Sequence, residues 1–488
     1  MKPFNRTLHA ALLSACLLSV CMSACTLGPD YVKPTMDVPA AFKEQQGWKI
    51  AQPQDELPRG KWWEIFGDST LNQLVEQVEV SNQNLRAAEA QYRQAQALAQ
   101  QAGAAYYPTV TGGVSATRSR SPGNTNSTFG SNSNSNTTYN LNVGVSWEAD
   151  LWGSIRRSVE AASTNAQASI ADIEAAKLSA QAELAQDYFL LRIADARKAL
   201  LDDTVAAYQK SLQLTQNQYN VGVAARADVV TADTQLKSAK AQAVDVGVQR
   251  AQLEHAIAIL IGKTPAEFSI APLTSKFALL PPPIPVGLPS QLLERRPDIA
   301  AAERRAASAN AKIGVAEAAF YPDLTLSGEL GFQSSSFAKW LTLPSRFWTL
   351  GPALAQSIFD GGLRKAQSAQ AVAVYDQSVA TYRQTILGGF QEVEDNLAAL
   401  RILEQEAALQ DDAVKAARES VQITTNQYKA GIVDFLNVVN VETIALDNER
   451  TALTIQSNRL SAAVSLIKAV GGGWNASDLN TDKDQAAK

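Results

Sequence analysis

Two long runs of residues without proline constrain the fold of this chain more than any other feature. The first run, residues 154–221, has 68 residues with neither glycine nor proline and is rich in Ala, Gln, Leu, Glu and Lys, which are strong helix formers. The second, residues 363–430, has the same length and contains the pair Gly388 and Gly389. Each run predicts a helix of roughly 100 Å. We expect a local bend or a close helix contact at the glycine pair.

The two runs are parts of an internal repeat. The segment TQNQYNVG at residues 215–222 returns 209 residues later as TTNQYKAG at residues 424–431. In both copies the glycines that flank the long run are 69 residues apart. We interpret this pattern as the duplication of a unit of about 200 residues.

The repeats set the expected domain boundaries. Repeat 1 covers residues 67–270 and is expected to contain a helix, a β-hairpin at about 106–150 and a long helical hairpin with its tip at about 219–228. Repeat 2 covers residues 298–471 in the same order, with a β-hairpin at about 321–360 and a tip at about 428–437. A linker at residues 271–297 joins the repeats, and a tail follows at residues 472–488.

The N-terminus has the pattern of an export signal. Two basic residues precede an apolar stretch at residues 10–22 that is too short to span a bilayer, so we expect residues 1–24 to be a cleaved signal peptide. Met22-Ser23-Ala24-Cys25 resembles the bacterial lipobox, which predicts lipid attachment at Cys25 and an acylated N-terminal segment at residues 25–66. The alternative is a chance cysteine near an ordinary cleavage site. Thr26, rather than an aspartate, follows, which in lipoproteins generally implies sorting to the outer membrane.

The composition of the expected mature chain excludes several kinds of protein. Cys16 and Cys21 lie in the signal segment, so neither an internal disulfide nor a thiol active site is expected. The remaining 41 basic and 48 acidic residues give a net charge of −7, which argues against nucleic acid as a partner. Only His255 and Met36 remain of their residue types. That scarcity favours drugs or other small molecules over copper or silver as cargo.

A heptad seam at residues 71–102 precedes the first expected strand and predicts one helix with many alanines on its packing face. Several such helices in one chain suggest a bundle or a helical barrel. No residue cluster suits catalysis: the sequence has no Gly-rich phosphate loop, its histidine is single and its carboxylates are scattered. We therefore expect neither an enzyme nor a metal or cofactor site, apart from the lipid on Cys25.

Between the helices the apolar period changes to two. Apolar residues alternate with polar ones along residues 139–147, with residues 109–119 as the partner strand, and again along residues 324–333, with a return strand at residues 348–354. The candidates for a polar bore are Asn140, Asn142, Thr325 and Glu329. The candidates for a lipid-facing surface are Tyr139, Val143, Leu326 and Phe332. The alternative interpretation is two soluble hairpins that cap a helical bundle.

Four strands of this length cannot form a closed ring by themselves. A membrane-spanning barrel needs all its backbone hydrogen bonds paired, and about eight strands is the usual minimum. If the hairpins enter lipid, several copies of the chain must therefore contribute to one barrel. The repeat thus predicts a homo-oligomer with pseudo-symmetry.

Several motifs identify a resemblance that covers essentially the whole mature chain. They are WWE at residues 62–64 with FGD at 66–68, the stretch VGLPS at 286–290 followed by RRPDI at 295–299, and the two NQYxxG turns. With the acylated start, these motifs resemble the TolC and OprM outer-membrane efflux channels.

The resemblance implies a mixed α/β membrane protein: a trimer whose twelve strands form one outer-membrane β-barrel, continued by a periplasmic barrel of long α-helices. It implies the exit channel of a tripartite pump, which conducts drugs or other small molecules. The implied partners are a periplasmic adaptor, an inner-membrane RND-type transporter and outer-membrane lipid. Three alternatives stay open: metal-ion efflux, type I protein secretion, and a periplasmic coiled-coil lipoprotein without a channel.

The resemblance also implies that the two helical tips form the periplasmic mouth and meet the adaptor. The tip residues concerned are Tyr219, Gly222, Asp228, Tyr428, Gly431, Asn437 and Asn440. Asp228 and Tyr428 occupy positions where family members tie neighbouring hairpins together, so we hypothesise that a hydrogen bond between them holds the mouth closed. The alternative is that Tyr428 only packs on its own hairpin. Val433, Asn437 and Asn440 depart from the arginine and aspartates of relatives, so no acidic constriction ring is expected here.

Overall fold

The computed structural model describes residues 27–45, 60–120, 135–273, 280–284, 290 and 294–475. The expected signal peptide and Cys25 lie outside this part of the chain, as do residues 274–279, 285–289 and 291–293 of the linker and residues 476–488 of the tail. The described residues belong to two compact units. Unit 1 is drawn from Met1–Thr35, Tyr92–Ala168 and Ala302–Tyr382, and unit 2 from Met36–Gln91, Ser169–Ala301 and Arg383–Lys488.

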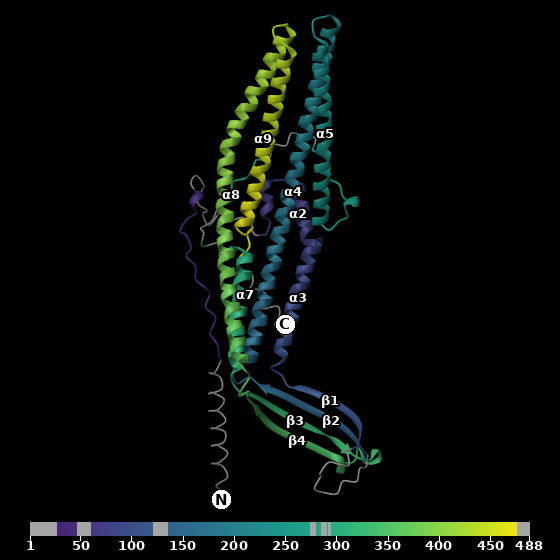
Figure 1. Cartoon of the computed structure of the whole chain (residues 1–488), viewed down its shortest axis with the longest axis vertical. Helices are drawn as coiled ribbons and strands as arrows, with labels where there is room; N and C mark the ends of the chain where they lie inside the picture. Colours follow the sequence, from purple (N-terminus) through teal and green to yellow (C-terminus); the bar gives the residue numbers. More distant parts are fainter. Residues whose placement is uncertain are drawn as a thin grey trace. The chain divides into compact units, whose positions relative to one another are not determined.

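Long helices and one antiparallel sheet make up the fold (Figure 1). The α-helices are α2 (Ser69–Ser81), α3 (Gln83–Ala104), α4 (Ser154–Asn220), α5 (Arg226–Leu260), α7 (Pro297–Ala318), α8 (Leu363–Lys429) and α9 (Phe435–Ala469). The strands are β1 (Thr109–Arg120), β2 (Ser135–Ala149), β3 (Asp323–Ser334) and β4 (Arg346–Ala355). Short 3-10 helices are η1 (Lys43–Gln45), η2 (Trp62–Phe66), η3 (Pro265–Glu267), η4 (Phe337–Lys339) and η5 (Leu343–Ser345).

The two long helices predicted from composition are confirmed. Helices α4 and α8 are each continuous over 67 residues. Gly388 and Gly389 lie inside α8 without ending it. A Cβ atom at Gly389 would lie 3.4 Å from the Arg296 side chain, which is an ordinary van der Waals distance, and a Cβ atom at Gly388 would have no atom within 4 Å, so the expected close helix contact is not found at either glycine. Arg296 also forms ion pairs with Asp298 and Glu392.

The single helix predicted over the heptad seam is wrong, because the chain leaves the helical conformation at Asn82. There α2 ends and α3 begins, and the Asn82 backbone is extended (ψ 123°). Its side-chain oxygen accepts the backbone N–H of Leu85 at 3.0 Å, while its amide donates to the Leu260 carbonyl at 2.8 Å. An asparagine that caps one helix and binds the end of another stabilises a break that heptad spacing does not reveal.

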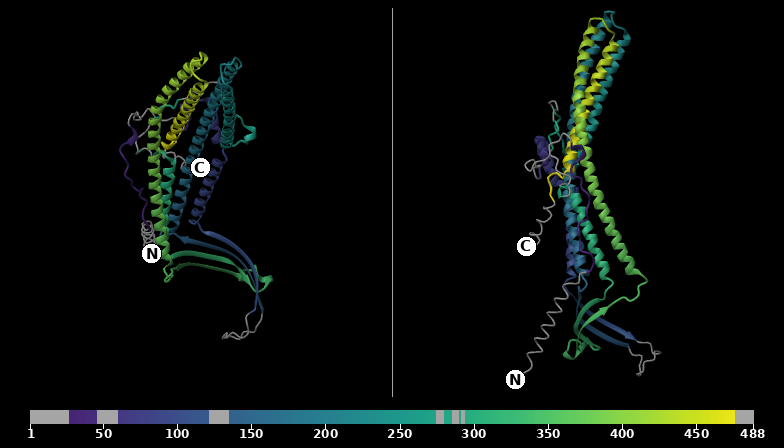
Figure 2. Two further views of the ribbon diagram at one scale, coloured as in Figure 1. Left: turned by 45° about the horizontal axis from the view of Figure 1, so that its top comes forward. Right: turned by 90° about the vertical axis from the view of Figure 1, so that its left-hand side faces the viewer.

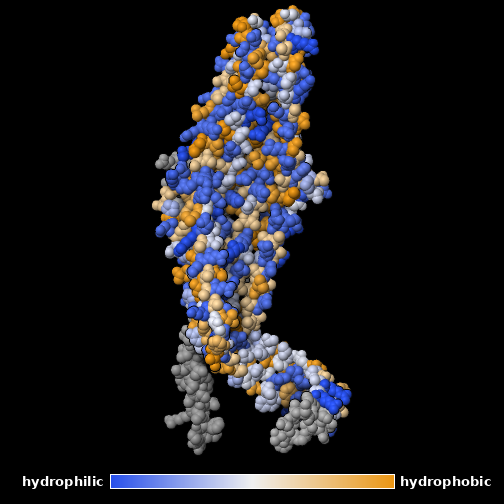
Figure 3. Space-filling model, in the orientation of Figure 1, coloured by the Kyte–Doolittle hydropathy of each residue, from blue (hydrophilic) through white to orange (hydrophobic). Residues whose placement is uncertain are grey.

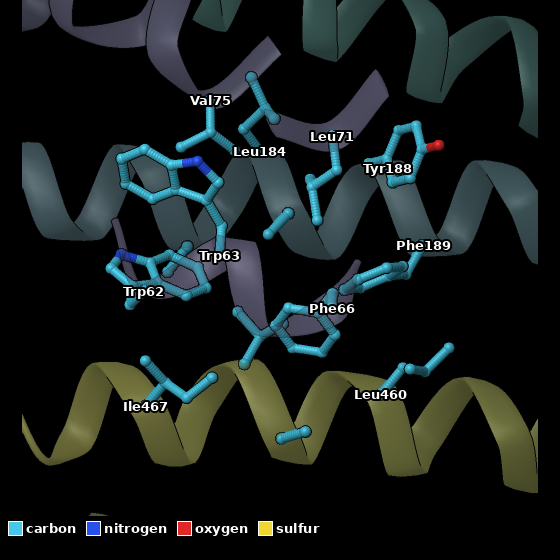
Figure 4. Close-up of a cluster of buried hydrophobic side chains, with 14 of the residues drawn as sticks. Trp62, Trp63, Phe66, Leu71, Val75, Leu184, Tyr188, Phe189, Leu460 and Ile467 are labelled. Atoms are coloured by element: carbon cyan, nitrogen blue, oxygen red, sulfur yellow. The ribbon is translucent and has the colours of Figure 1, made fainter. Parts of the chain in front are cut away.

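The core of unit 2 is built around the WWE and FGD segments. Trp62, Trp63 and Phe66 are buried and pack against α2, α4 and α9 (Figure 4). Gly67 follows with a positive φ of 65° and ends the 3-10 helix. Asp68 then caps α2 and also accepts a 2.6 Å hydrogen bond from the Tyr188 hydroxyl on α4. These motif residues therefore fix a short connection against the long helices.

The sheet of unit 1 is antiparallel in the order β1-β2-β3-β4, and the predicted strand pairs are confirmed. The pairing continues without interruption across all four strands, so side chains alternate regularly between the two faces. The sheet is curved along its strands (Figure 2). Residues 121–134, which join β1 to β2 in the sequence, are outside the described chain.

Candidate functional site

One face of the sheet is polar and holds the four predicted bore residues. The register places Asn142 opposite Gly331 and Thr325 opposite Glu148, so Asn140, Asn142, Thr325 and Glu329 lie on the same face. The Asn142 amide donates to the Glu329 carboxylate at 2.7 Å. Two of the predicted residues thus bind each other across β2 and β3.

Glycines lie beside this pair on β1 and β3. A Cβ atom at Gly113 would come within 2.6 Å of the Asn142 side-chain oxygen. A Cβ atom at Gly331 would come within 2.1 Å of the Leu141 carbonyl. Both distances are too short for any larger residue without movement of its surroundings. At Gly113 the Asn142 side chain occupies this space, whereas at Gly331 the backbone of β2 and the Phe347 ring do.

The opposite face is apolar and exposed. It contains all four predicted lipid-facing residues, Tyr139, Val143, Leu326 and Phe332. Further members of this apolar face are Val110, Val114, Leu141, Val145, Trp147, Leu330, Trp348, Leu350 and Leu354. Trp348 is 72% exposed and Leu350 80%. Orange and pale residues also lie over the sheet in the space-filling view (Figure 3). A continuous exposed apolar face of this kind marks a surface that is covered in the working protein.

Aromatic residues gather at both ends of the strands. At the loop end, Tyr139 contacts Phe337 and Trp340 with ring centroids 5.4 and 5.7 Å apart. At the helix end, Trp152 stacks on Tyr321 at 4.8 Å, and the Trp147 indole donates to the Tyr106 carbonyl at 3.0 Å. Two aromatic groups that border an apolar band are typical of strands that cross an outer membrane.

The two predicted helical tips are tight turns that share two backbone hydrogen bonds around their glycines. In the first, the N–H groups of Gly222 and Val223 donate to the carbonyls of Tyr219 and Gln218, both at 2.9 Å. In the second, Gly431 and Ile432 donate to the carbonyls of Tyr428 and Gln427, at 3.0 and 2.9 Å. Gly222 and Gly431 have positive φ angles of 82° and 72°. This pattern is the glycine C-cap of a helix, and it explains why glycine occurs at these positions.

The side chains at the tips do not form the hydrogen bond that we hypothesised between Asp228 and Tyr428. The Tyr428 hydroxyl instead donates to Thr215 Oγ1 on α4 at 3.4 Å, and its ring packs on Phe435 of its own hairpin at 5.4 Å. The Asp228 carboxylate accepts the backbone N–H of Ala225 at 3.1 Å, because it caps the start of α5. Both groups therefore satisfy their hydrogen bonds with nearer partners.

Electrostatics near the second tip follow from this packing. Burial is the main cause that raises the pKa of the Tyr428 phenol above its ordinary value, and the negative charge of Asp228 adds to the shift. Asn437 and Asn440 are exposed on α9, while Phe435 and Val438 of the same helix are buried. The two asparagines thus form an exposed amide surface at the second tip.

One contact at the sheet end of unit 1 was not predicted from sequence. The backbone N–H of Leu27 donates to the Trp152 carbonyl at 3.3 Å, just after β2. The buried guanidinium of Arg157 donates to the Leu27 and Gly28 carbonyls and forms an ion pair with Asp30 at 2.9 Å. A Cβ atom at Gly28 would lie 2.4 Å from the Cα atom of Gly314 on α7, so the segment sits directly on the helix backbone.

Tyr31 completes this attachment by donating to the Glu303 carboxylate at 2.6 Å. The sequence signal that could have indicated the segment is weak: it consists of Gly28, shortly after Cys25, and Gly314 within a helix-forming stretch. Among the described residues no helix has the length and apolar character needed to cross a bilayer.

Comparison with known proteins matches the chain to one family over most of its length. The model of the family described as outer membrane efflux protein matches residues 74–263 and 288–472. The toluene efflux pump outer membrane protein TtgC of Pseudomonas putida is 30% identical over 474 residues, which cover 95% of this chain and 96% of that protein. The pyoverdine export outer membrane protein OpmQ of the same species is 31% identical, covering 94% and 97%.

A solved structure agrees with these relatives. The outer-membrane channel OprN superposes with a TM-score of 0.85 at 31% sequence identity, over 92% of this chain and 100% of that one. The similarity therefore includes both the helices and the sheet. The chain belongs to the outer membrane efflux protein family.

Proposed function

We propose that this chain forms the outer-membrane exit channel of an efflux pump, with three copies joined into one tube. The observation that carries the proposal is the curved sheet with one exposed apolar face and one polar face. Strands β1 and β4 lie at the edges of the sheet in a single chain. In lipid the backbone groups of these edges must be paired, and neighbouring copies supply the missing strands.

Three copies would give twelve strands, which is within the range of outer-membrane barrels. The polar faces, with Asn142 and Glu329, would then line the bore, and the apolar faces would contact lipid. The long helices would continue the passage into the periplasm. As a member of a family of transport proteins, the chain has no reaction to catalyse and conducts its cargo passively.

The proposal includes the duplication of one ancestral unit. Helices α4 and α8 begin 209 residues apart and have equal lengths, and so do α5 and α9, with 35 residues each. The equal turns at Gly222 and Gly431 support the same inference. Repeats 1 and 2 then contribute equivalent hairpins, and a trimer contains six nearly equivalent helical pairs.

Acylation of Cys25 is also part of the proposal. Cys25 is two residues before Leu27 in the sequence, and Leu27 binds the Trp152 carbonyl near the helix end of the apolar sheet face. Two residues of chain extend at most about 7 Å. The attachment of residues 27–31 therefore supports a lipid anchor close to the inner surface of the membrane.

The tips are proposed to form the periplasmic mouth and to meet the adaptor, which in turn joins an inner-membrane transporter of the RND type. The contact that helps to close the mouth is proposed to be the one between Tyr428 and Thr215, in place of a hydrogen bond between Tyr428 and Asp228. The exposed Asn437 and Asn440 are proposed as part of the docking surface.

The names of the relatives guide the proposed cargo. They are named for the efflux of antibiotics and toluene and for the export of pyoverdine. All these are organic small molecules, which supports drugs or similar compounds as cargo of this chain over metal ions or secreted proteins.

Cysteine labelling tests the function through the two sheet faces. The expected mature chain has no cysteine besides Cys25, so a single cysteine introduced at Asn140, Asn142, Leu141 or Val143 would be the only other thiol available for labelling. In the assembled protein in lipid, a membrane-impermeant maleimide should label the first two positions and not the second two. Heat-modifiable trimer bands and single-channel currents should accompany this pattern. A soluble monomer without currents would instead indicate a coiled-coil lipoprotein.

A further inference from the structure

The two repeats contain the same isoleucine in two different environments. Ile193 on α4 is 3% exposed, while Ile402 on α8, its equivalent 209 positions later, is 52% exposed. Ser457 on α9 is buried, while its equivalent on α5, Val248, is 59% exposed. Equivalent positions of a duplicated unit have similar surroundings in a symmetric assembly. The exposed members therefore indicate a surface that is open in a single chain and covered in the working protein.

The buried members belong to two helix faces that pack on each other. Side-chain hydrogen bonds join α4 to α9 along these faces, from Lys468 to Ser179 at 3.1 Å, from Gln186 to Ser465 at 3.0 Å and from Arg197 to Thr454 at 2.9 Å. Ile193 follows Gln186 by seven residues and precedes Arg197 by four, so helical spacing places it on the same face. Ser457 follows Thr454 by three residues and lies on the matching face of α9. Both residues are thus buried where α4 and α9 meet.

Helices α4 and α9 are the middle pair of a row. In the half of unit 2 that ends in the tips, the order is α8, α9, α4 and α5 (Figure 1 and Figure 2). Gln410 on α8 donates to Asn448 on α9 at 2.9 Å, and Arg250 on α5 binds Asp195 on α4 at 2.7 Å. The exposed isoleucine and valine therefore lie on the two helices that end the row.

We propose that the face of α8 with Gly388 and Ile402 packs on the face of α5 with Val248 and Ile259 in a second copy of this chain. The contact repeats the α4–α9 interface between chains and continues it around the proposed trimer, on which this inference rests. A second copy is the partner that fits, because each side of the contact has its equivalent in an interface that the chain already forms. The register places Ile402 level with Val248 of the second copy.

The glycine pair of α8 has a role in this contact. Gly388 is equivalent to Ser179, and Ile259, which is 64% exposed, is equivalent to Lys468. The hydrogen bond between Lys468 and Ser179 within the chain thus corresponds to a contact of Ile259 with Gly388 between chains. Isoleucine is shorter than lysine, and glycine lets the two helices approach closely enough for it to reach. The space beside Gly388, where a Cβ atom would have no neighbour within 4 Å, is open to that side chain.

Apolar residues rather than ion pairs stabilise the contact. At the positions that correspond to the third hydrogen bond, the open faces carry Glu406 and Asp245, which are both negative and do not attract each other. Nearer the tips, Leu409 on α8 and Val244 on α5 are exposed apolar residues on the same two faces. We therefore expect the strength of the contact to depend on side-chain size.

Cross-linking in the purified, acylated trimer tests the register. The variant with Gly388→Cys and Ile259→Cys, treated with a short bismaleimide, should give dimer and trimer bands on denaturing gels, while each single variant should give monomer bands. The matched control is Ser179→Cys with Lys468→Cys, which should react within one chain and stay at the monomer position. If the control pair loses its thiols and the first pair gives neither dimer nor trimer bands, the proposal is overturned.

A change of side-chain size tests the packing independently. Gly388→Leu should lower the temperature at which trimer bands disappear by about 10 °C, because leucine would occupy the space of Ile259 at three contacts. Leucine is a better helix former than glycine, so this loss cannot come from α8 itself. Adding Ile259→Ala should restore about half of the loss.

Ala199→Leu is the control for added bulk. It changes an exposed position of α4 outside the face that packs on α9, and it should leave the temperature within about 2 °C of the wild type. A Gly388→Leu trimer as stable as the wild type, or one that Ile259→Ala does not restore, would refute the contact.

The same samples separate this inference from the proposed function. A wild type with trimer bands and channel currents, combined with cysteines at Gly388 and Ile259 that do not cross-link between chains, would refute this contact alone. A wild type that stays monomeric and passes no current would refute the proposed channel and, with it, the basis of the contact.

Discussion

The two helical tips have the same backbone and different side-chain environments. Their glycine turns share every hydrogen bond described above. Yet Tyr428 in the second tip is 6% exposed, while Tyr219, the equivalent residue 209 positions earlier, is 40% exposed. The Tyr428 hydroxyl reaches Thr215 on the neighbouring hairpin. In the part of the chain that the structure describes, no hydrogen bond joins the Tyr219 hydroxyl to the other hairpin.

The difference shows that the local sequence determines the backbone of the turn. Contact with a second hairpin determines how far the tyrosine is buried and which group its hydroxyl binds. Each chain contains two helical hairpins and can form one tyrosine–threonine contact between them. We call this contact, here between Tyr428 and Thr215, a joint. The equivalent of Thr215 in repeat 2 is Thr424. In the proposed trimer, Tyr219 of one copy is expected to face Thr424 of the next, so that the second kind of joint needs two chains.

The first prediction, with the largest effect, concerns which chains are joined. Cysteines at Thr215 and Tyr428, treated with a short bismaleimide in the trimer, should cross-link within one chain. Cysteines at Tyr219 and Thr424 should cross-link between chains. On denaturing gels the first pair should therefore remain at the monomer position, and the second should give dimer and trimer bands. Monomer bands from both pairs would contradict the expected contact between Tyr219 of one chain and Thr424 of the next.

The second prediction concerns the buried ring. Tyr428→Ala removes a large side chain from the cluster that includes Ala232, Phe435 and Val438, which should destabilise the second tip by about 3 kcal/mol. Amide hydrogen exchange at the tip should then accelerate about a hundredfold.

Its matched control is Tyr428→Phe, which keeps the ring and loses the hydroxyl. That variant should accelerate exchange only about fivefold, equivalent to about 1 kcal/mol for one hydrogen bond. The same change should also raise the closed-state current if the Thr215 contact helps to close the mouth. Equal exchange rates in the alanine and phenylalanine variants would show that the ring contributes little.

Much of this arrangement could be predicted from the sequence. Composition alone indicated the 67-residue helices, because no residue within the runs ends a helix. The period of two assigned Asn142 and Leu326 to the correct faces, because strand side chains alternate regularly. The glycines at the tips located the turns, because only glycine readily adopts positive φ there.

Other features depend on contacts between residues far apart in the chain. The break at Asn82 needs the end of α5, where a Cβ atom at Gly262 would lie 2.2 Å from the Ser81 carbonyl. The attachment of residues 27–31 needs Arg157 and Gly314, which are more than a hundred positions away. The partner of Tyr428 depends on how two hairpins pack. No local pattern contains this information.

The third prediction addresses what the two tips share. Gly222→Ala and Gly431→Ala should each destabilise their turn by about 1 kcal/mol, because alanine is strained at positive φ. Neither glycine has an atom within 4 Å of its Cβ position, so no steric clash adds to this cost. Exchange at each tip should accelerate about fivefold and by the same factor. Unequal factors would indicate that the turns are not equivalent.

The fourth prediction, with the smallest effect, uses pH to distinguish the tips. Burial raises the folded-state pKa of Tyr428 above the ordinary value of about 10 for tyrosine. The neutral phenol is therefore favoured in the folded tip, and the resulting stability is complete below pH 10 and is lost as the pH rises toward the folded-state pKa. At pH 10.5 the loss is at most about fourfold in the opening equilibrium, because only the opened state ionises freely.

Amide exchange measures this loss, after correction for its intrinsic pH dependence. Protection at the second tip should fall by this factor between pH 9 and pH 10.5 in the wild type and stay constant in Tyr428→Phe. Phenylalanine keeps the packing and removes the titrating group. A decrease of the same size in both proteins would therefore show that another residue titrates, and that ionisation of the Tyr428 phenol does not distinguish the two tips.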